Sequence, residues 1–218
     1  HNHTVVGDTR TDRVLALAEE PFIDPLLEAF SRGQRVLVAG STWPADEKLL
    51  HAWWLAHPEA RLVVAPHEIS PARTKALCAL FGPDAVVYTQ SHPQQVQQAR
   101  VLILNTMGML GKVYRYGQAA YIGGGFGKGI HNTLEAAVYG IPVYFGPNHH
   151  KFVEAAGLKA AGIGSAVHTV KELREGWQQL ESESTQAHIR QQASEWFKKQ
   201  AGASRQIMAM VNRLLEAK

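Results

Sequence analysis

Short apolar runs alternate with longer amphipathic stretches along most of this 218-residue chain. Each run is brief and rich in β-branched residues, as expected of a parallel strand that helices cover on both faces. Repeated strand–helix alternation predicts βαβ units with right-handed crossovers, and therefore one parallel sheet in an α/β fold. The predicted strands are Arg35–Gly40, Arg61–Pro66, Ala85–Tyr88, Val101–Leu104, Ala120–Gly123, Pro142–Phe145 and Ser165–His168.

Helical patterns fill the intervals between these strands. The predicted helices are Pro44–Ala56, Ser70–Phe81, Gly108–Tyr116, Asn132–Tyr139, Phe152–Ala161 and Val170–Leu180. Residues 1–33 are expected to form a helical lead-in, and residues 185–218 a C-terminal helix, either unbroken or divided near Gly202. Because no repeat or long linker interrupts the chain, we expect a single domain over residues 1–218.

Composition excludes several classes of protein. The one cysteine, Cys78, has no disulfide partner and points to a reducing compartment. The apolar runs are too short to span a membrane, and the polar amino end lacks the apolar core of a signal peptide. The net charge of +3 comes from scattered basic residues, which argues against a nucleic-acid partner. The chain starts at His1 rather than Met, as a piece of a longer protein would.

The catalytic and metal-binding patterns that can be sought in the sequence are absent. The chain has no G-x-S-x-G elbow, and therefore no sign of a serine hydrolase of that type. His149 and His150 are adjacent, but no cysteine or third histidine stands at ligand spacing, so we expect no metal. We also expect no cofactor.

The least ordinary segment is Tyr121–Pro147, where an apolar run enters five glycines within seven residues. It matches neither the P-loop pattern nor G-x-G-x-x-G. Glycines let the backbone turn sharply and let a ligand approach closely, although a tight strand-to-helix turn would also explain some of them. The number of glycines favours a ligand site.

Asn132 and Glu135 follow the glycines at a spacing of three, which supports two interpretations. Asn at the N-cap with Glu three residues later resembles a capping box. The same spacing leaves Glu135 free to face the loop, where its carboxylate could accept hydrogen bonds from a ribose diol. Both interpretations remain open on spacing alone.

Three other predicted loops follow the carboxyl ends of strands, where ligands of parallel sheets bind. Ser41 and Thr42 are expected to cap the helix that starts at Pro44, and could instead donate to a phosphate or carboxylate. His67 is either a polar loop residue or a partner for an anion. Met107 is either a core residue or a soft surface for a flat base.

Taken together, these segments resemble the C-terminal domain of bacterial 3-deoxy-D-manno-octulosonic acid (Kdo) transferases. The elements that carry the resemblance run in the family's order from about residue 5 to 155, and the combination of TMG with HN-x-x-E is the most specific part. They are VVGDTRTDRV (5–14), VAGSTWPADE (38–47), APHE (65–68), NTMGML (105–110), YIGGGF (121–126), HNTLEAA (131–137) and IPVYFGPNHHKF (141–152).

The resemblance implies a Rossmann-like domain, the C-terminal half of a GT-B glycosyltransferase, that binds the donor CMP-Kdo. Carried over by position, the nucleotide-binding residues would be Pro66, His67, Met107, Gly108, Met109, Asn132, Thr133, Leu134 and Glu135. The chain departs from the family at two of these positions. Many members have Arg where this chain has His67, and an acidic residue often stands where it has Met109.

The family's catalytic glutamate belongs to an N-terminal domain, so the resemblance assigns no catalytic residue to this chain and predicts no activity of the chain alone. The full enzyme would transfer Kdo to the lipid A precursor in lipopolysaccharide biosynthesis, at the cytoplasmic face of the bacterial inner membrane. Two alternatives stay open. One is another GT-B member that uses a UDP-sugar, either a transferase or a UDP-N-acetylglucosamine 2-epimerase. The other is a non-catalytic nucleotide-binding module.

Overall fold

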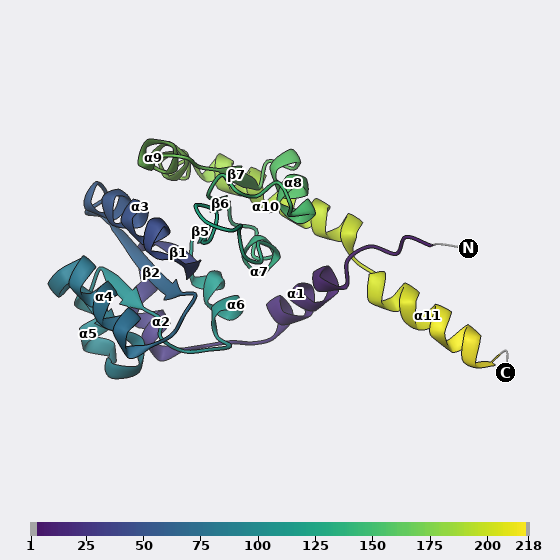
Figure 1. The fold of residues 1–218 in the computed structure, drawn as a ribbon, viewed down its shortest axis with the longest axis horizontal. Coiled ribbons are helices and arrows are strands. Elements are labelled where there is room, and N and C mark those ends of the chain that lie inside the picture. The colour runs from purple at the N-terminus through teal and green to yellow at the C-terminus, as the bar shows by residue number, and fades with distance from the viewer. Residues whose placement is uncertain (1–3, 217–218) are drawn as a thin grey trace.

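Seven strands form one parallel sheet, in the order β3-β4-β2-β1-β5-β6-β7, in a computed structural model that describes residues 4–216 (Figure 1). Every neighbouring pair in this sheet is parallel, so helices or long loops must connect the strands. The strands are β1 (Arg35–Thr42), β2 (Ala60–Pro66), β3 (Ala85–Val87), β4 (Val101–Ile103), β5 (Ala119–Ile122), β6 (Val143–Phe145) and β7 (Gly164–Ala166). All seven predicted strands are confirmed, with ends that differ by one or two residues.

The described residues include eleven α-helices, and those that pack on the sheet complete the predicted Rossmann-like α/β fold. The helices are α1 (Thr9–Glu19), α2 (Pro25–Ser31), α3 (Pro44–Leu55), α4 (Pro71–Phe81), α5 (Pro93–Gln98), α6 (Leu110–Val113), α7 (Leu134–Ala137), α8 (Val153–Ala160), α9 (Val170–Gln179), α10 (Glu183–Gln200) and α11 (Ala203–Glu216). Short 3-10 turns occupy Gly82–Asp84, Tyr88–Gln90 and Tyr114–Tyr116.

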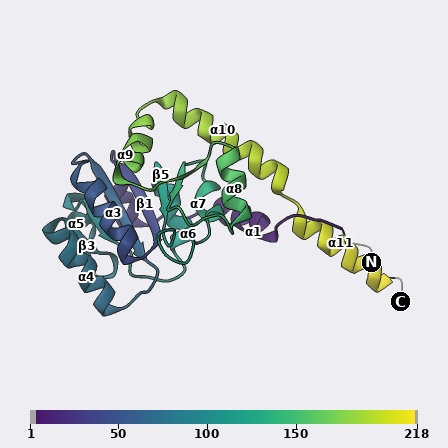
Figure 2. The same cartoon turned by 45° about the horizontal axis from the view of Figure 1, so that its top comes forward.

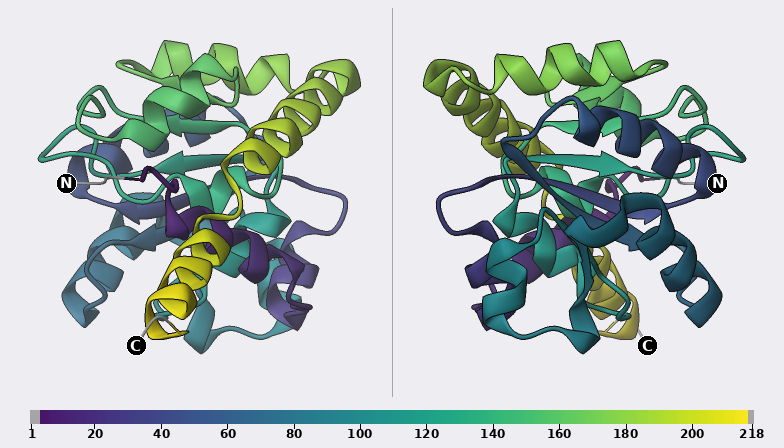
Figure 3. Two further views of the ribbon diagram at one scale, coloured as in Figure 1. Left: turned by 90° about the vertical axis from the view of Figure 1, so that its right-hand side faces the viewer. Right: turned by 90° about the vertical axis from the view of Figure 1, so that its left-hand side faces the viewer.

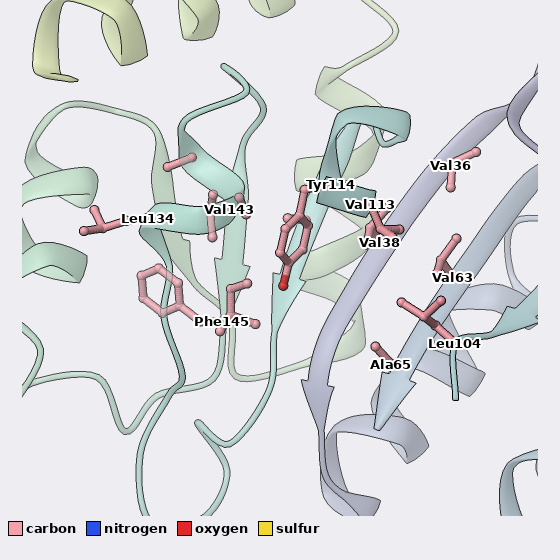
Figure 4. Close-up of a cluster of buried hydrophobic side chains, with 14 of the residues drawn as sticks. Val36, Val38, Val63, Ala65, Leu104, Val113, Tyr114, Leu134, Val143 and Phe145 are labelled. Carbon is pink, nitrogen blue, oxygen red and sulfur yellow. The ribbon is translucent and has the colours of Figure 1, made fainter. Parts of the chain in front are cut away.

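The alternation of side chains along β1 divides the core into two layers. Val36 and Val38 face a cluster that includes Tyr114 and the inner sides of α2, α6, α7 and α8 (Figure 4). Leu37 and Ala39 face the opposite cluster, which α3, α4 and α9 cover and which holds the edge-to-face pair of Trp53 and Trp177. Successive side chains of a strand point to opposite faces, so one apolar run supplies both layers. The predicted sandwich of a parallel sheet between helices is thus confirmed.

Two predicted helices are much shorter than their sequence patterns. The pattern at Gly108–Tyr116 yields only α6 followed by a 3-10 turn. The pattern at Asn132–Tyr139 yields only the single turn of α7, which has Val138 as its C-cap and is followed by a turn that ends at Gly140 with a φ of +69°. In both segments, the loop between the preceding strand and the helix contains residues that the periodicity assigns to helix. The prediction also missed α5, because its sequence PQQVQQ has one buried apolar residue and therefore no helical period.

The carboxyl-terminal segment forms two helices rather than one, as the alternative with a break near Gly202 predicted. Gly202 has a φ of +104°, and the carboxylate of Asp12 in α1 accepts hydrogen bonds from the backbone N–H groups of Gly202 and Ser204 at 2.7 Å. Asp12 therefore ties α1 to the start of α11, and the two helices cross the front of the left panel of Figure 3. Beyond this contact α11 extends away from the sheet (Figures 1 and 2).

Across residues 4–216, we find no helix that combines the length and the apolar character needed to span a bilayer.

Candidate functional site

The strand order reverses at β1, which has β2 on one side and β5 on the other. The chain moves outward from β1 through β2 to the β4–β3 edge and then returns to β5, so the loops after β1 and β5 diverge. In open α/β sheets such a switch point leaves a crevice beyond the carboxyl ends of the strands, and ligands bind there. The loops that border this crevice follow β1, β2, β4 and β5.

The glycine loop after β5 is built from close contacts between backbones. A Cβ atom added at Gly123 would lie 2.3 Å from the carbonyl oxygen of Ser41, and one added at Gly125 would lie 2.6 Å from the backbone of Gly146. Gly124 adopts a φ of +93°, a conformation that favours glycine. Gly123 and Gly125 are therefore required by the packing of the loop against β1 and the residue after β6, and Gly124 by its own backbone conformation. A ligand is not needed to explain them, although the sequence argument gave it that role.

Asp46 in the first turn of α3 holds the glycine loop in place. Its carboxylate is 1% exposed and accepts three hydrogen bonds, from the Tyr121 hydroxyl at 2.8 Å and from the backbone N–H groups of Gly124 and Trp43 at 2.9 Å each. Burial next to this carboxylate raises the pKa of Tyr121 far above its ordinary value. One side chain thus connects β5, the glycine loop and the start of α3.

The predicted caps of α3 are wrong. Trp43 occupies the N-cap position, and Asp46 accepts from its backbone N–H, so neither Ser41 nor Thr42 caps the helix. Thr42 is 1% exposed, and its hydroxyl donates to the buried carboxylate of Glu47 at 3.1 Å. Ser41 has a φ of 53°, which is unusual for a residue other than glycine, and it lies where the register between β1 and β2 shifts. The Thr42 hydroxyl is therefore already used inside the protein, whereas the Ser41 hydroxyl makes no hydrogen bond within the described residues.

Three aromatic rings from three different loops meet at the switch point. Trp43 stacks on His67 with a centroid separation of 4.8 Å, and His67 stacks on His131 at 4.2 Å. The indole N–H of Trp43 donates to Nε2 of His131 at 3.2 Å. Burial, followed by the nearby His67, lowers the pKa of His131, and Asp46 partly opposes this shift. We call these three residues the ring stack.

A cavity of about 580 Å³ opens between α1 and the loops that lead into α6 and α7, and it is lined by Asn132, the residue after His131. Gly108, Asn132 and Glu135 all line it, so three predicted nucleotide-binding residues converge on one space. Its volume lies in the range of ordinary small-ligand pockets. Arg10 and Arg13 of α1 line the opposite side. Arg10 is paired with Asp8 and Glu154, whereas Arg13 makes no ion pair with any residue of the described chain.

Asn132 and Glu135 do not form a capping box. The side-chain oxygen of Asn132 accepts from the backbone N–H of Leu134 at 3.0 Å, and its amide nitrogen donates to Oε1 of Glu135 at 3.0 Å. A capping box would instead direct the Glu135 carboxylate to the backbone N–H at the N-cap. Asn132 therefore supports the start of α7 and also orients Glu135, whose second carboxylate oxygen, Oε2, has no such partner in the described structure.

Comparison with known proteins places these features in context, although no family model matches the sequence. The chain is 28% identical over 130 residues to 3-deoxy-D-manno-octulosonic acid transferase of Rickettsia prowazekii, a match that covers 56% of this chain and 28% of the relative. It is 37% identical over 75 residues to the enzyme of the same name from Aquifex aeolicus, covering 34% of this chain and 21% of the relative.

The fold is similar to that of the C-terminal CMP-Kdo binding domain of WaaA from Acinetobacter baumannii. The TM-score is 0.68 at 16% identity, and the match covers 87% of this chain and 98% of that domain. The resemblance to Kdo transferases is confirmed. The shared fold is the Rossmann-like parallel sheet between helices described above. The matches span only about a quarter of the length of the two curated Kdo transferases.

The other residues carried over from the Kdo transferase resemblance differ in what they can offer a ligand. Met107 is 88% exposed, so its interpretation as a core residue is wrong and its thioether is free to meet a ligand. Met109 is half-buried and packs on the core, and its sulfur accepts from the Thr106 hydroxyl at 3.1 Å. Thr133 and Leu134 are fully buried.

Pro66 is also buried and ends β2, beside the exposed His67. Buried positions such as Pro66, Thr133 and Leu134 can contribute only backbone groups to a ligand.

Sequence reasoning missed several residues of this site. Trp43, Asp46 and His131 stood only within motifs that carry the family resemblance, and no role in the site was predicted for them. Arg10 and Arg13 belong to the lead-in, and nothing in their local pattern places α1 against the cavity. No group of three or more His, Cys, Asp or Glu side chains within residues 4–216 is placed to hold a metal ion.

Proposed function

We propose that this chain is the donor-binding domain of a Kdo transferase and that it binds CMP-Kdo in the cavity between α1 and the loops that lead into α6 and α7. The observation that carries the proposal is the convergence of Gly108, Asn132 and Glu135 on one cavity at the switch point of the sheet. The similarity to Kdo transferases supports the choice of donor. The similarity in fold to a CMP-Kdo binding domain is consistent with it.

In this proposal Glu135 fixes the ribose. Asn132 holds Oε1, which leaves Oε2 directed toward the cavity side of Gly111, at 3.4 Å from the position of a Cβ on that glycine. A carboxylate oriented in this way can accept hydrogen bonds from a ribose diol, as acidic residues do in other dinucleotide-binding folds. Gly108, with a φ of +79° and no side chain, lets the nucleotide approach the loop after β4.

The whole protein would transfer Kdo to the lipid A precursor at the cytoplasmic face of the inner membrane. In the family pattern the acceptor hydroxyl is activated by a glutamate of the N-terminal domain, attacks the anomeric carbon and displaces CMP. The part of this chain would be to bind and orient the donor. Because α7 is a single turn, its dipole can add little to stabilisation of the leaving phosphate.

Titration calorimetry with CMP and UDP on the 218-residue chain tests the donor. We expect CMP to bind more tightly than UDP. Loss of a hydrogen bond to a charged group is worth about 1.5–3 kcal/mol, so Glu135→Ala should weaken CMP binding roughly 10- to 150-fold. Glu135→Gln, which keeps an acceptor without the charge, should fall between the wild type and Glu135→Ala.

The matched control is Glu59→Ala, which removes an exposed carboxylate between α3 and β2. It should leave CMP affinity unchanged. Unchanged affinity in a folded Glu135→Ala variant would limit Glu135 to its contact with Asn132. Tighter binding of UDP would favour a UDP-sugar enzyme. If CMP binds but joining the N-terminal half restores no transfer, the chain is a non-catalytic nucleotide-binding module.

A further inference from the structure

The two imidazoles of the ring stack differ in their freedom to accept a proton. Trp43 donates its indole N–H to Nε2 of His131, so this nitrogen must carry a lone pair. The neutral ring then carries its proton on Nδ1. Protonation of His131 at Nε2 would set an N–H against the indole N–H and break the bond. The His67 ring is exposed and makes no hydrogen bond within the described part of the chain.

The electrostatic surroundings point in the same direction. The charged or titratable groups that act on His131 are His67, from the loop after β2, and Asp46, from α3. The carboxylate of Asp46 is already occupied by three donors. The net effect is a lowered pKa of His131, because burial and the neighbouring imidazole outweigh Asp46. Glu68 follows His67 in the sequence and is exposed.

The ring stack does not line the cavity itself, but it is partly exposed and adjoins a lining residue in the sequence. His131 immediately precedes Asn132, which lines the cavity, and it is half-buried under the exposed ring of His67. An imidazole that is fixed as an Nδ1–H donor beside a second, protonatable imidazole matches the chemistry of an oxyanion. Both rings can donate to it, and one of them can also supply a full positive charge.

We propose that the ring stack is an anion seat coupled to proton uptake. In this seat His67 takes up a proton when an oxyanion of the donor binds, and His131, held neutral by Trp43, donates its Nδ1–H to the same group. The proposal rests on the proposed function for the identity of the ligand, whose phosphate or sugar carboxylate supplies the oxyanion. It assigns Trp43 a positioning role, because this residue acts on the ligand only through His131.

The sign of the linkage follows from the uptake. Because the bound state holds more protons than the free state, the proposal predicts that CMP affinity falls as the pH rises. A neighbouring opposite charge usually shifts a titration by about one unit or more. We therefore expect CMP affinity to drop about tenfold between pH 6 and pH 8, with uptake of up to one proton.

Calorimetry of CMP binding in buffers with different ionisation enthalpies measures this uptake directly. His67→Gln should abolish both the uptake and the pH dependence. His131→Gln should weaken binding and leave the pH dependence in place. His188→Gln is the control, since it removes an exposed histidine from α10, and it should change neither quantity. Cytidine and free Kdo separate the two oxyanions: uptake with CMP but not cytidine identifies the phosphate, and uptake with Kdo alone identifies the carboxylate.

Nitrogen-15 spectra of the histidine rings provide a readout that a purely structural role would not move. In the free chain they should show His131 as the Nδ1–H tautomer, and Trp43→Phe should abolish that preference. Binding of CMP without proton uptake, or uptake that persists in His67→Gln, would overturn the anion seat and leave the proposed function standing. If CMP does not bind, proton uptake by His67 when inorganic phosphate binds still supports the anion seat. If neither CMP binding nor this proton uptake is seen, both proposals are refuted.

Discussion

Replacement of Asp46 tests whether one buried carboxylate holds the glycine loop against the sheet. Asp46→Ala leaves three buried donors without an acceptor, namely the Tyr121 hydroxyl and the backbone N–H groups of Gly124 and Trp43. An unsatisfied buried donor costs about 1–3 kcal/mol. Because water can enter part of the space left by the carboxylate and satisfy some of these donors, we expect the free energy of unfolding to fall by about 3–5 kcal/mol. This is a large fraction of the about 5–15 kcal/mol that stabilises a typical domain.

Asp46→Asn separates the hydrogen bonds from the charge. The amide oxygen can take the position of Oδ2 and accept from both backbone N–H groups, while the Tyr121 hydroxyl turns to accept from the amide nitrogen. We expect a loss of only about 1–2 kcal/mol, because neutral hydrogen bonds are weaker than charged ones. The asparagine also removes the charge that raises the pKa of His131, so that pKa should fall further.

Urea denaturation followed by tryptophan fluorescence measures the stability of both Asp46 variants. Glu59→Ala is the control, and as an exposed substitution it should stay within about 0.5 kcal/mol of the wild type. We expect the urea midpoint to be highest for the wild type, lower for Asp46→Asn and lowest for Asp46→Ala. If Asp46→Ala unfolds at the same urea concentration as Glu59→Ala, Asp46 does not anchor the loop.

Two further predictions concern the same edge of the sheet, and urea denaturation measures both. Gly123→Ala places a Cβ 2.3 Å from the carbonyl oxygen of Ser41 and should cost about 3 kcal/mol, whereas Gly127→Ala, in the same loop with its nearest neighbour at 3.6 Å, should stay within about 0.5 kcal/mol of the wild type. Equal stability of these two variants would contradict the packing argument. Arg73→Met removes the cationic partner that lies 2.5 Å from the buried carboxylate of Glu47, and it should lower the free energy of unfolding by about 3 kcal/mol or more. A shift in the urea midpoint no larger than that of Gly127→Ala would contradict this prediction.

The strands could be predicted from the sequence because each is a short apolar run between polar segments. Burial on both faces demands such a run, and β1 shows it most clearly, since five consecutive residues from Val36 to Gly40 are buried. The helices could be predicted less well. At α6 and α7, which follow the loops after β4 and β5, the conformation of the loop rather than the periodicity of the sequence decides how many residues become helical. Local pattern carries no information about that geometry.

The proposed nucleotide-binding residues could be named in advance only through the resemblance to Kdo transferases. Spacing alone left Glu135 between a capping role and a ligand role. The structure removes the capping box, because Asn132 makes the contact with the helix start and also holds one oxygen of Glu135. Asp46 and His131 could not be found in this way. Their roles depend on contacts with residues 78 and 88 positions away in the chain.

The glycine loop shows why an unusual sequence feature and the chemistry of a site need not coincide. Gly123 and Gly125 are required because two backbones meet there, at β1 and at β6, with no room for a side chain. That close packing brings the loops after β1, β2 and β5 near enough for Trp43, His67 and His131 to stack. If the proposed function holds, the glycines act on the ligand indirectly. They make the edge of the sheet compact, and the side chains that this compact edge brings together would provide the hydrogen bonds and the charge.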